Sequence, residues 1–145
     1  MEKFNSYKIL VFGLPGSGKT TFARQLAINI EYFNADDVRK MFNDWDFSVE
    51  GRLRQAERMY CLTNLVDGSS VTDFICPYNN NRQDYDITVW INTINKGRFD
   101  DTNQIFEKPD YCTYEIKNYN PVNKITIEDE LVKYVKSNMN DNKKG

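Results

Sequence analysis

Residues 13–20 read Gly13-Leu14-Pro15-Gly16-Ser17-Gly18-Lys19-Thr20, close to the start of the chain. The glycine spacing and the final Lys-Thr pair match G-x-x-x-x-G-K-[ST], the loop that binds the phosphates of nucleoside triphosphates. Residues 7–12 before it read as a short buried strand, and residues 21–28 after it carry apolar side chains at helical spacing. Because a strand, a glycine-rich turn and a helix are the context that this motif requires, the sequence predicts a phosphate-binding loop.

The residue types of this loop fit its chemistry. Successive backbone N–H groups must point at phosphate oxygens, and glycine tolerates the necessary dihedral angles best. The helix that follows directs the positive end of its dipole at the same anion. We expect Lys19 to reach the β- and γ-phosphates of ATP and the Thr20 hydroxyl to bind Mg²⁺. The predicted nucleotide-binding residues are Gly13, Leu14, Pro15, Gly16, Ser17, Gly18, Lys19, Thr20 and Thr21. The alternative is a glycine-rich turn that happens to end in Lys-Thr.

The composition is that of an ordinary globular protein. The 145 residues are 40% hydrophobic and 28% charged, which suits a single domain, expected over residues 1–138 with a polar tail over 139–145. The net charge of −2 argues against broad electrostatic binding to duplex nucleic acid, although it leaves room for a local basic pocket. No apolar run is long enough to cross a membrane and no signal peptide is visible, so we expect a cytoplasmic protein.

The cysteine and histidine content limits which metal-binding and catalytic groups the protein can use. The three cysteines are odd in number and widely spaced, so we expect reduced, partly buried thiols without a metal site. Histidine is absent, so a general base has to be a carboxylate or a less usual group.

Strands and helices alternate along the rest of the chain. The β/α alternation predicts a three-layer α/β/α sandwich around a mostly parallel five-stranded sheet, the fold of nucleotide kinase-like P-loop NTPases. About ten residues separate the third and fourth strands, which is short for a parallel crossover, so either one or two helical turns suffice or the strands are not adjacent. Strands are expected over 7–12, 31–34, 70–76, 87–91 and 111–116; helices to about residue 30, over 35–42, from 48 to 67 and from 126; and a loop over 93–110.

With these segments in place, the chain resembles the adenylylsulfate kinase (APS kinase) family over residues 8–109. The family's D-G-D-x-x-R stretch corresponds to 34–39, L-N-x-x-x-G-F-S to 42–48 and F-I-S-P-Y-R to 74–79. Its R-x-x-N-x-x-R helix appears as Arg52, Gln55 and Arg58. The chain departs from the family at three positions and in a lid shortened to residues 95–99, as in the APS-kinase-like proteins of bacteria and phages. The three departing residues are Asn34 for the first carboxylate of D-G-D, Gln55 for Asn, and Cys76 for Ser.

The resemblance implies an ATP- and Mg²⁺-dependent kinase that phosphorylates a hydroxyl of adenylylsulfate or a similar nucleotide. Asp36 would receive the proton of the substrate hydroxyl, and Phe47 would stack on the substrate adenine. The other substrate-binding positions carried over are Arg39, Arg52, Gln55, Arg58, Ile75, Cys76 and Pro77. A homodimer is compatible with the resemblance.

Further candidates come from the residues themselves. Asp73 lies within a strand, where a carboxylate is costly unless it is paired or bound to a metal, so we consider it a Mg²⁺ ligand beside Thr20. The alternative is a carboxylate that points at the phosphate-binding loop or at solvent. Arg98 lies in the shortened lid and could stabilise the transferring phosphate, unless it is simply an exposed loop arginine. Trp45, Phe47 and Phe99 could clamp a base by stacking, or pack in the core.

Two other functions stay open at this point. One is a kinase for another hydroxyl, such as a nucleoside, a modified base in DNA or a small metabolite. The other is a nucleotide-binding module or NTPase that transfers phosphate to no acceptor.

Overall fold

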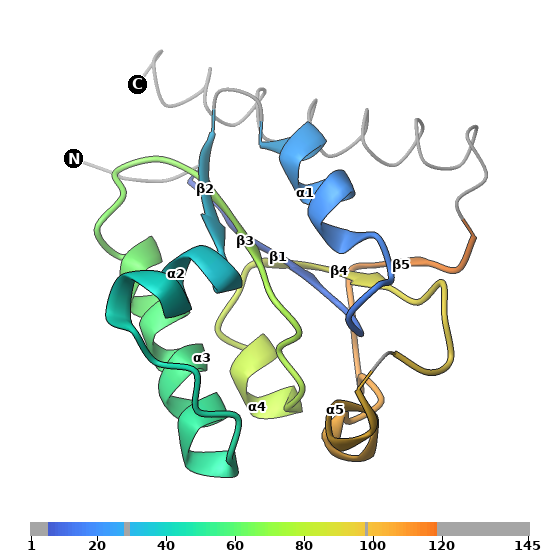
Figure 1. Cartoon of the computed structure of the whole chain (residues 1–145). Helices are drawn as coiled ribbons and strands as arrows, with labels where there is room; N and C mark the ends of the chain where they lie inside the picture. Colours follow the sequence, from blue (N-terminus) through green and yellow to red (C-terminus); the bar gives the residue numbers. More distant parts are fainter. Residues whose placement is uncertain (1–5, 28–29, 98, 119–145) are drawn as a thin grey trace.

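The computed structural model describes residues 6–27, 30–97 and 99–118. Within them the chain alternates between strands and helices (Figure 1). The strands are β1 (Lys8–Phe12), β2 (Glu31–Asn34), β3 (Ser70–Asp73), β4 (Ile87–Ile91) and β5 (Tyr114–Ile116). The helices are α1 (Lys19–Leu26), α2 (Ala35–Phe42), α3 (Val49–Thr63), α4 (Asn79–Arg82) and α5 (Asp100–Ile105).

The five strands form one parallel sheet in the order β2-β3-β1-β4-β5. Helix α1 lies on one side of the sheet, and α2, α3, α4 and α5 lie on the other (Figure 1). The predicted three-layer α/β sandwich with a parallel five-stranded sheet is therefore confirmed. Because β1 lies between β3 and β4, the strands on either side of the short connection are not adjacent, and the four-residue helix α4 suffices to link them.

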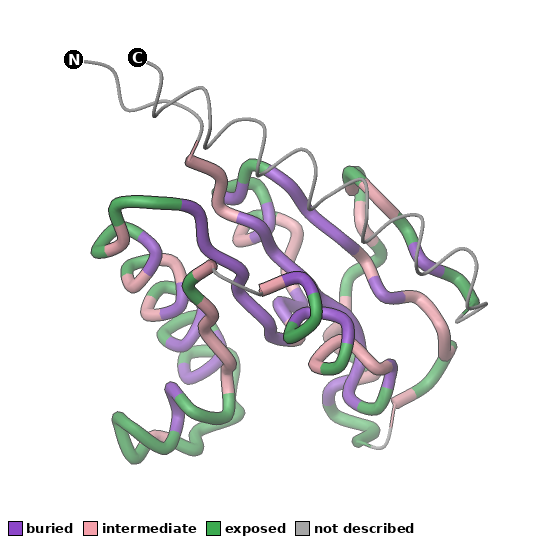
Figure 2. The backbone as a smooth tube through the Cα atoms, turned by 90° about the horizontal axis from the view of Figure 1, so that it is seen from above, coloured by how far each residue is buried: buried purple, intermediate pink, exposed green. Residues whose placement is uncertain are grey.

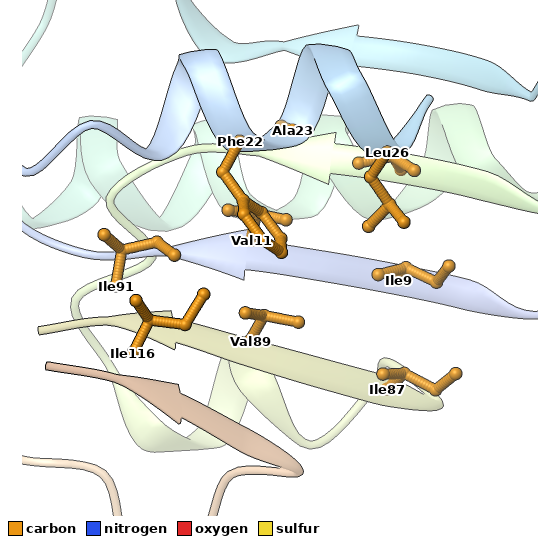
Figure 3. Packing of buried hydrophobic residues seen from close by; sticks show 10 residues of the cluster. Ile9, Val11, Phe22, Ala23, Leu26, Ile87, Val89, Ile91 and Ile116 are labelled. Carbon is orange, nitrogen blue, oxygen red and sulfur yellow. The ribbon is translucent and has the colours of Figure 1, made fainter. Parts of the chain in front are cut away.

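Alternate residues of β1 supply the two halves of the core. Ile9 and Val11 face α1 and pack with Phe22 and Leu26 (Figure 3). Leu10 and Phe12 point to the opposite face, where they join a second cluster with Val38, Ala56 and Met59. All four β1 side chains have no exposed surface, which is why this strand reads as an unbroken apolar run. Buried residues follow the strands, and exposed residues gather on the outer turns (Figure 2).

The predicted bounds hold for β2, α2 and β4 and need correction elsewhere. Strand β3 ends at Asp73 instead of residue 76, since the chain leaves the sheet and Cys76 adopts a left-handed φ of 45°. Strand β5 begins only at Tyr114, and α3 ends at Thr63. The stretch 100–105, predicted as loop, is the helix α5. The predicted helix from residue 126 and the tail 139–145 lie outside the described residues.

None of the helices in the described ranges combines the length and the hydropathy of a membrane span. The three thiols are free, as predicted, but only Cys76 is buried; Cys112 is half-buried and Cys61 is exposed.

Candidate active site

The phosphate-binding loop is shaped by glycine and braced by the chain after β4. Gly16 and Gly18 have φ values of 87° and 95°, which side chains with a Cβ rarely adopt. A Cβ on Gly13 would lie 2.6 Å from the Ile91 carbonyl oxygen, so only glycine fits this approach of β1 to β4. The Thr93 hydroxyl donates to the Ser17 carbonyl at 2.7 Å. The loop therefore has a fixed backbone from which α1 begins at Lys19.

A cavity of about 730 Å³ opens beside this loop. Its walls come from the loop, the start of α2, α3, the residues around the end of β3, and Phe99, Asp101 and Thr102. The structure thus brings together segments that are far apart in the sequence. The predicted site residues that line the cavity are Pro15, Gly16, Gly18, Lys19, Thr20, Thr21, Asp36, Arg39, Phe47, Arg52, Gln55, Asp73, Ile75, Cys76 and Pro77.

Some predicted site residues lie elsewhere. Gly13, Leu14 and Ser17 belong to the loop but do not line the cavity. Arg58 does not line it either: its guanidinium pairs with Asp44 at 2.8 Å and lies over the Phe42 ring. Arg98 falls outside the described residues, so its role stays a prediction.

Asp73 is the most buried carboxylate of the site. It has no exposed surface and lies at the end of β3, opposite Asn34 in the sheet. Its Oδ2 accepts hydrogen bonds from the Tyr32 hydroxyl at 2.7 Å and from the Asn34 amide at 3.0 Å. Its Oδ1 is buried and has no hydrogen-bond partner. Burial, followed by the hydrogen bond to Asp73, raises the pKa of Tyr32 to about 12.

This arrangement fits a magnesium ion. Mg²⁺ takes oxygen ligands and is usually held by one or two protein groups together with water and substrate phosphates. Thr20 and Asp73 both line the cavity, and the orphaned Oδ1 is such an oxygen. The described residues contain no group of three or more Cys, Asp or Glu that could hold a metal without the nucleotide.

Asp36 lies in the first turn of α2, on the exposed rim of the cavity. Asn34 caps this helix, because its side-chain oxygen accepts from the backbone N–H groups of Asp36 at 3.0 Å and Asp37 at 3.2 Å. The cap is therefore supplied by Asn34, and the Asp36 carboxylate is not needed for it.

Two nearly buried arginines surround Phe47. The guanidinium of Arg39 lies 4.3 Å from the centre of the Phe47 ring, and that of Arg52 lies 5.3 Å from it. Arg39 donates to the carbonyl oxygens of Asp44 and Asp46, and burial lowers its pKa. Of the two, only Arg52 has an ion pair among the described residues.

The turn between α2 and α3 is held by charge. Asp44 accepts from Arg54 at 2.8 Å and pairs with Arg58, and these contacts, led by the Arg54 hydrogen bond, hold its pKa well below the usual range. A Cβ on Gly51 would overlap the Asp46 carbonyl oxygen, so the turn packs closely on α3. This close packing fixes the position of Phe47.

The three aromatic candidates differ in whether they line the cavity. Trp45, Phe47 and Phe99 are all about half exposed, so core packing does not explain them. Phe47 and Phe99 line the cavity, whereas Trp45 does not.

Sequence reasoning missed Asn34, Ala35, Phe74, Asp101 and Thr102 as cavity residues. Asp101 accepts from Arg52 at 3.1 Å, and the Thr102 hydroxyl lies 3.3 Å from the same nitrogen. Both residues closely follow the shortened lid in the sequence, but no spacing rule connects residues 101 and 102 to Arg52.

The wall formed by residues 74–77 is held from behind by Arg82. This arginine is 3% exposed and donates to the carbonyl oxygens of Cys76 at 2.8 Å and Pro77 at 3.0 Å. Its guanidinium also contacts the rings of Phe12 and Phe106, at 4.5 and 4.8 Å from their centres.

No protein-family model matches the sequence, and no curated protein matches it either. Solved structures are similar. An APS kinase of Mycobacterium tuberculosis in complex with AMPPNP and APS is 16% identical with a TM-score of 0.70, covering 90% of this chain and 98% of that one. A shikimate kinase of Acinetobacter baumannii in complex with shikimate is 17% identical with a TM-score of 0.56, covering 92% and 94%. A gluconokinase of Sinorhizobium meliloti is 14% identical with a TM-score of 0.58, covering 97% and 94%. At these identities the likeness establishes the fold, which is that of P-loop kinases.

Proposed function

We propose that the chain is an ATP- and Mg²⁺-dependent kinase that transfers the γ-phosphate of ATP to a hydroxyl of a small molecule. The observation that carries this proposal is the cavity itself, in which the phosphate-binding loop meets Asp36, Asp73 and Arg39. A donor site, a carboxylate and a cation beside one another are what phosphoryl transfer needs, because it depends on positioning and on neutralising charge.

Each group has a role in this reaction. The loop N–H groups and Lys19 hold the β- and γ-phosphates of ATP. Thr20 and Asp73 would hold a Mg²⁺ ion, which would supply further positive charge there. The acceptor oxygen attacks the γ-phosphorus, the bond from that phosphorus to the bridging oxygen breaks, and ADP leaves. Asp36 receives the hydroxyl proton. Its place on the exposed rim leaves it accessible to an acceptor.

The rest of the cavity suits an acceptor with a flat ring. Phe47 and Phe99 present half-exposed aromatic side chains, and Phe74, Ile75 and Pro77 add apolar surface. Arg39, which has no carboxylate partner within the described ranges, suits an anionic group of the acceptor. An adenylylsulfate-like nucleotide has both features and is our leading candidate.

A second candidate is a neutral hydroxyl compound. It is favoured by the ion pairs, because Arg52 is already paired with Asp101, and Arg58 is paired with Asp44 away from the cavity. With those two cations engaged, the acceptor end carries less free positive charge than the sequence suggests.

The test is phosphoryl transfer from γ-labelled ATP to a panel of adenylylsulfate, adenosine, shikimate and gluconate. Transfer to adenylylsulfate alone supports the leading candidate. Transfer only to adenosine, the uncharged compound of the panel, supports the second. Asp36→Asn should reduce the rate about 10²-fold or more, as expected for loss of a general base. Asp37→Asn, a neighbouring exposed carboxylate that does not line the cavity, is the control and should change little. Transfer to no compound of the panel, with intact ATP binding, would instead favour a nucleotide-binding module.

A further inference from the structure

The two carboxylate oxygens of Asp73 have different surroundings. Oδ2 is held by two donors from β2, the Tyr32 hydroxyl and the Asn34 amide, at 2.7 and 3.0 Å. Oδ1 is buried and unpartnered. Because rotation about the last side-chain bond of aspartate is soft, a carboxylate without such donors would turn freely. The two hydrogen bonds therefore select which oxygen stays available.

Asn34 uses both ends of its amide. Its Oδ1 accepts from the backbone N–H groups of Asp36 and Asp37, so the oxygen and nitrogen positions follow from the chemistry of the donors. Its Nδ2 donates to Asp73 at 3.0 Å and lies 3.3 Å from the Tyr32 hydroxyl. One side chain thus connects the buried carboxylate at the end of β3 with the helix turn that carries Asp36.

This geometry explains why residue 34 is not a carboxylate here. An aspartate at this position could still cap α2, but it would have no donor for Asp73. It would also place two carboxylates within about 3 Å of each other, an arrangement in which one of them has to stay protonated. Serine or threonine could cap the helix but could not supply the amide donor to Asp73.

We propose that Tyr32 and Asn34 are positioning residues that hold Asp73 so that its Oδ1 serves the magnesium ion or a water bound to it. The inference rests on the proposed function, because it assumes that a Mg²⁺–nucleotide complex occupies the cavity. Outer hydrogen-bond partners of this kind orient metal-binding carboxylates in many proteins.

The test is calorimetric titration of the whole chain with ATP, once with Mg²⁺ and once with EDTA. The quantity measured is the gain in ATP affinity that Mg²⁺ provides. Tyr32→Phe and Asn34→Ser should leave the affinity in EDTA unchanged and reduce the Mg²⁺-dependent gain about 10-fold. Asn34→Ser retains an oxygen for the cap of α2, and circular dichroism checks that both variants fold.

Two matched controls separate this role from a general effect of the substitutions. Tyr114→Phe removes the phenolic hydroxyl of a half-buried tyrosine that packs against the same apolar cluster as Tyr32. Asn92→Ser removes an amide that donates to a carboxylate, Glu115, after β4 and outside the cavity. Both control variants should show the same Mg²⁺-dependent gain in ATP affinity as the unmodified protein.

The exchange variant N34D/D73N is the sharpest test. It keeps a carboxylate–amide pair across β2 and β3 but moves the carboxylate to the other strand. We expect the fold to persist and the Mg²⁺-dependent gain to be lost. A full gain in the exchange variant, or in both Tyr32→Phe and Asn34→Ser, overturns the inference and leaves the kinase proposal intact. Failure of the unmodified protein to bind ATP overturns both.

Discussion

The cavity has two sides, which the proposed reaction would use for the phosphate donor and for the acceptor, and the two are built in different ways. The donor side is eight consecutive residues, 13–20, whose shape depends on backbone geometry and on glycine. The acceptor side consists of side chains from α2, the turn after it, α3, the end of β3 and α5. Its members are held by bonds between segments, such as Arg52 to Asp101 and Gln55 to the Ala35 carbonyl.

This difference shows which changes each side tolerates. A backbone-made site keeps its shape unless a glycine or the bracing carbonyl groups are disturbed. A site made of side chains can change its ligand by single substitutions on an unchanged scaffold. The likeness in fold to an APS kinase, a shikimate kinase and a gluconokinase agrees with this view.

Lys19→Ala should have the largest effect and should act on the donor side alone. Loss of a cation that neutralises charge in the transition state is expected to reduce phosphoryl transfer about 10³-fold. Measured as transfer of label from γ-labelled ATP, the change should appear with every acceptor that the unmodified protein phosphorylates. Lys40→Ala is the control, since Lys40 is exposed on α2 and does not line the cavity. Equal rates in the two variants would remove Lys19 from the reaction.

Arg82→Ala should disturb the acceptor side and spare the donor side. It leaves the Cys76 carbonyl oxygen without its donor and takes one of two donors from the Pro77 carbonyl, which also accepts from the Glu107 N–H. We therefore expect unfolding in urea to become easier by about 2 kcal/mol. The acceptor KM should rise because residues 74–77 form the wall, while ATP affinity in calorimetry stays within about twofold of the unmodified value. Gln83→Ala, an exposed neighbour on the same turn, should have neither effect. A variant that loses ATP affinity as much as acceptor affinity would mean that the two sides are not separate.

The same division decides what could be predicted from the sequence. The phosphate-binding loop, β1 and α1 were predictable, because a contiguous motif and an apolar strand carry the signal. The buried state of β1 and the parallel sheet followed from the β/α alternation and from apolar side chains on both faces of the strand.

Most of the acceptor side was predictable only through the family resemblance, whereas Asp73 and Phe99 were candidates from residue type alone. The placement of Arg39 and Arg52 in the cavity agrees with it, whereas Arg58 lies away from the cavity because Asp44 and Phe42 offer it closer partners. Helix α5 was missed because its sequence has no apolar periodicity. It is stabilised instead by contacts with distant residues, such as the ion pair of Arg52 with Asp101. The Asn103 amide likewise binds both the N–H and the carbonyl of Gly97, at 2.7 and 3.1 Å, at the base of the shortened lid.

Asp101→Asn should have a smaller effect that depends on the acceptor. The carboxylate is 68% exposed, so removing its charge should change the free energy of unfolding by less than about 1 kcal/mol. The change frees Arg52 from its ion pair. The KM of an anionic acceptor should therefore fall about fivefold, and that of a neutral acceptor should stay the same. Asp100→Asn, the exposed neighbour, is the control. A KM that falls equally for a neutral acceptor would show that the effect does not come from freeing the charge of Arg52, because asparagine keeps the size of aspartate.

Acid should weaken the acceptor side through Asp44, and this is the smallest effect that we expect. Arg54 first, and then the Asp46 N–H, keep the folded-state pKa of Asp44 below the ordinary value near 4. A depressed pKa contributes stability above the ordinary value and loses it as the pH falls toward the folded-state pKa. Urea unfolding of the unmodified protein and of Asp44→Asn should therefore differ by a constant amount between pH 7 and 5, and the difference should shrink below pH 4. A difference that stays the same at pH 3 would show that Asp44 stabilises the turn through its pattern of hydrogen-bond acceptors rather than through its charge, and the acceptor side would then depend less on ion pairs than its geometry indicates.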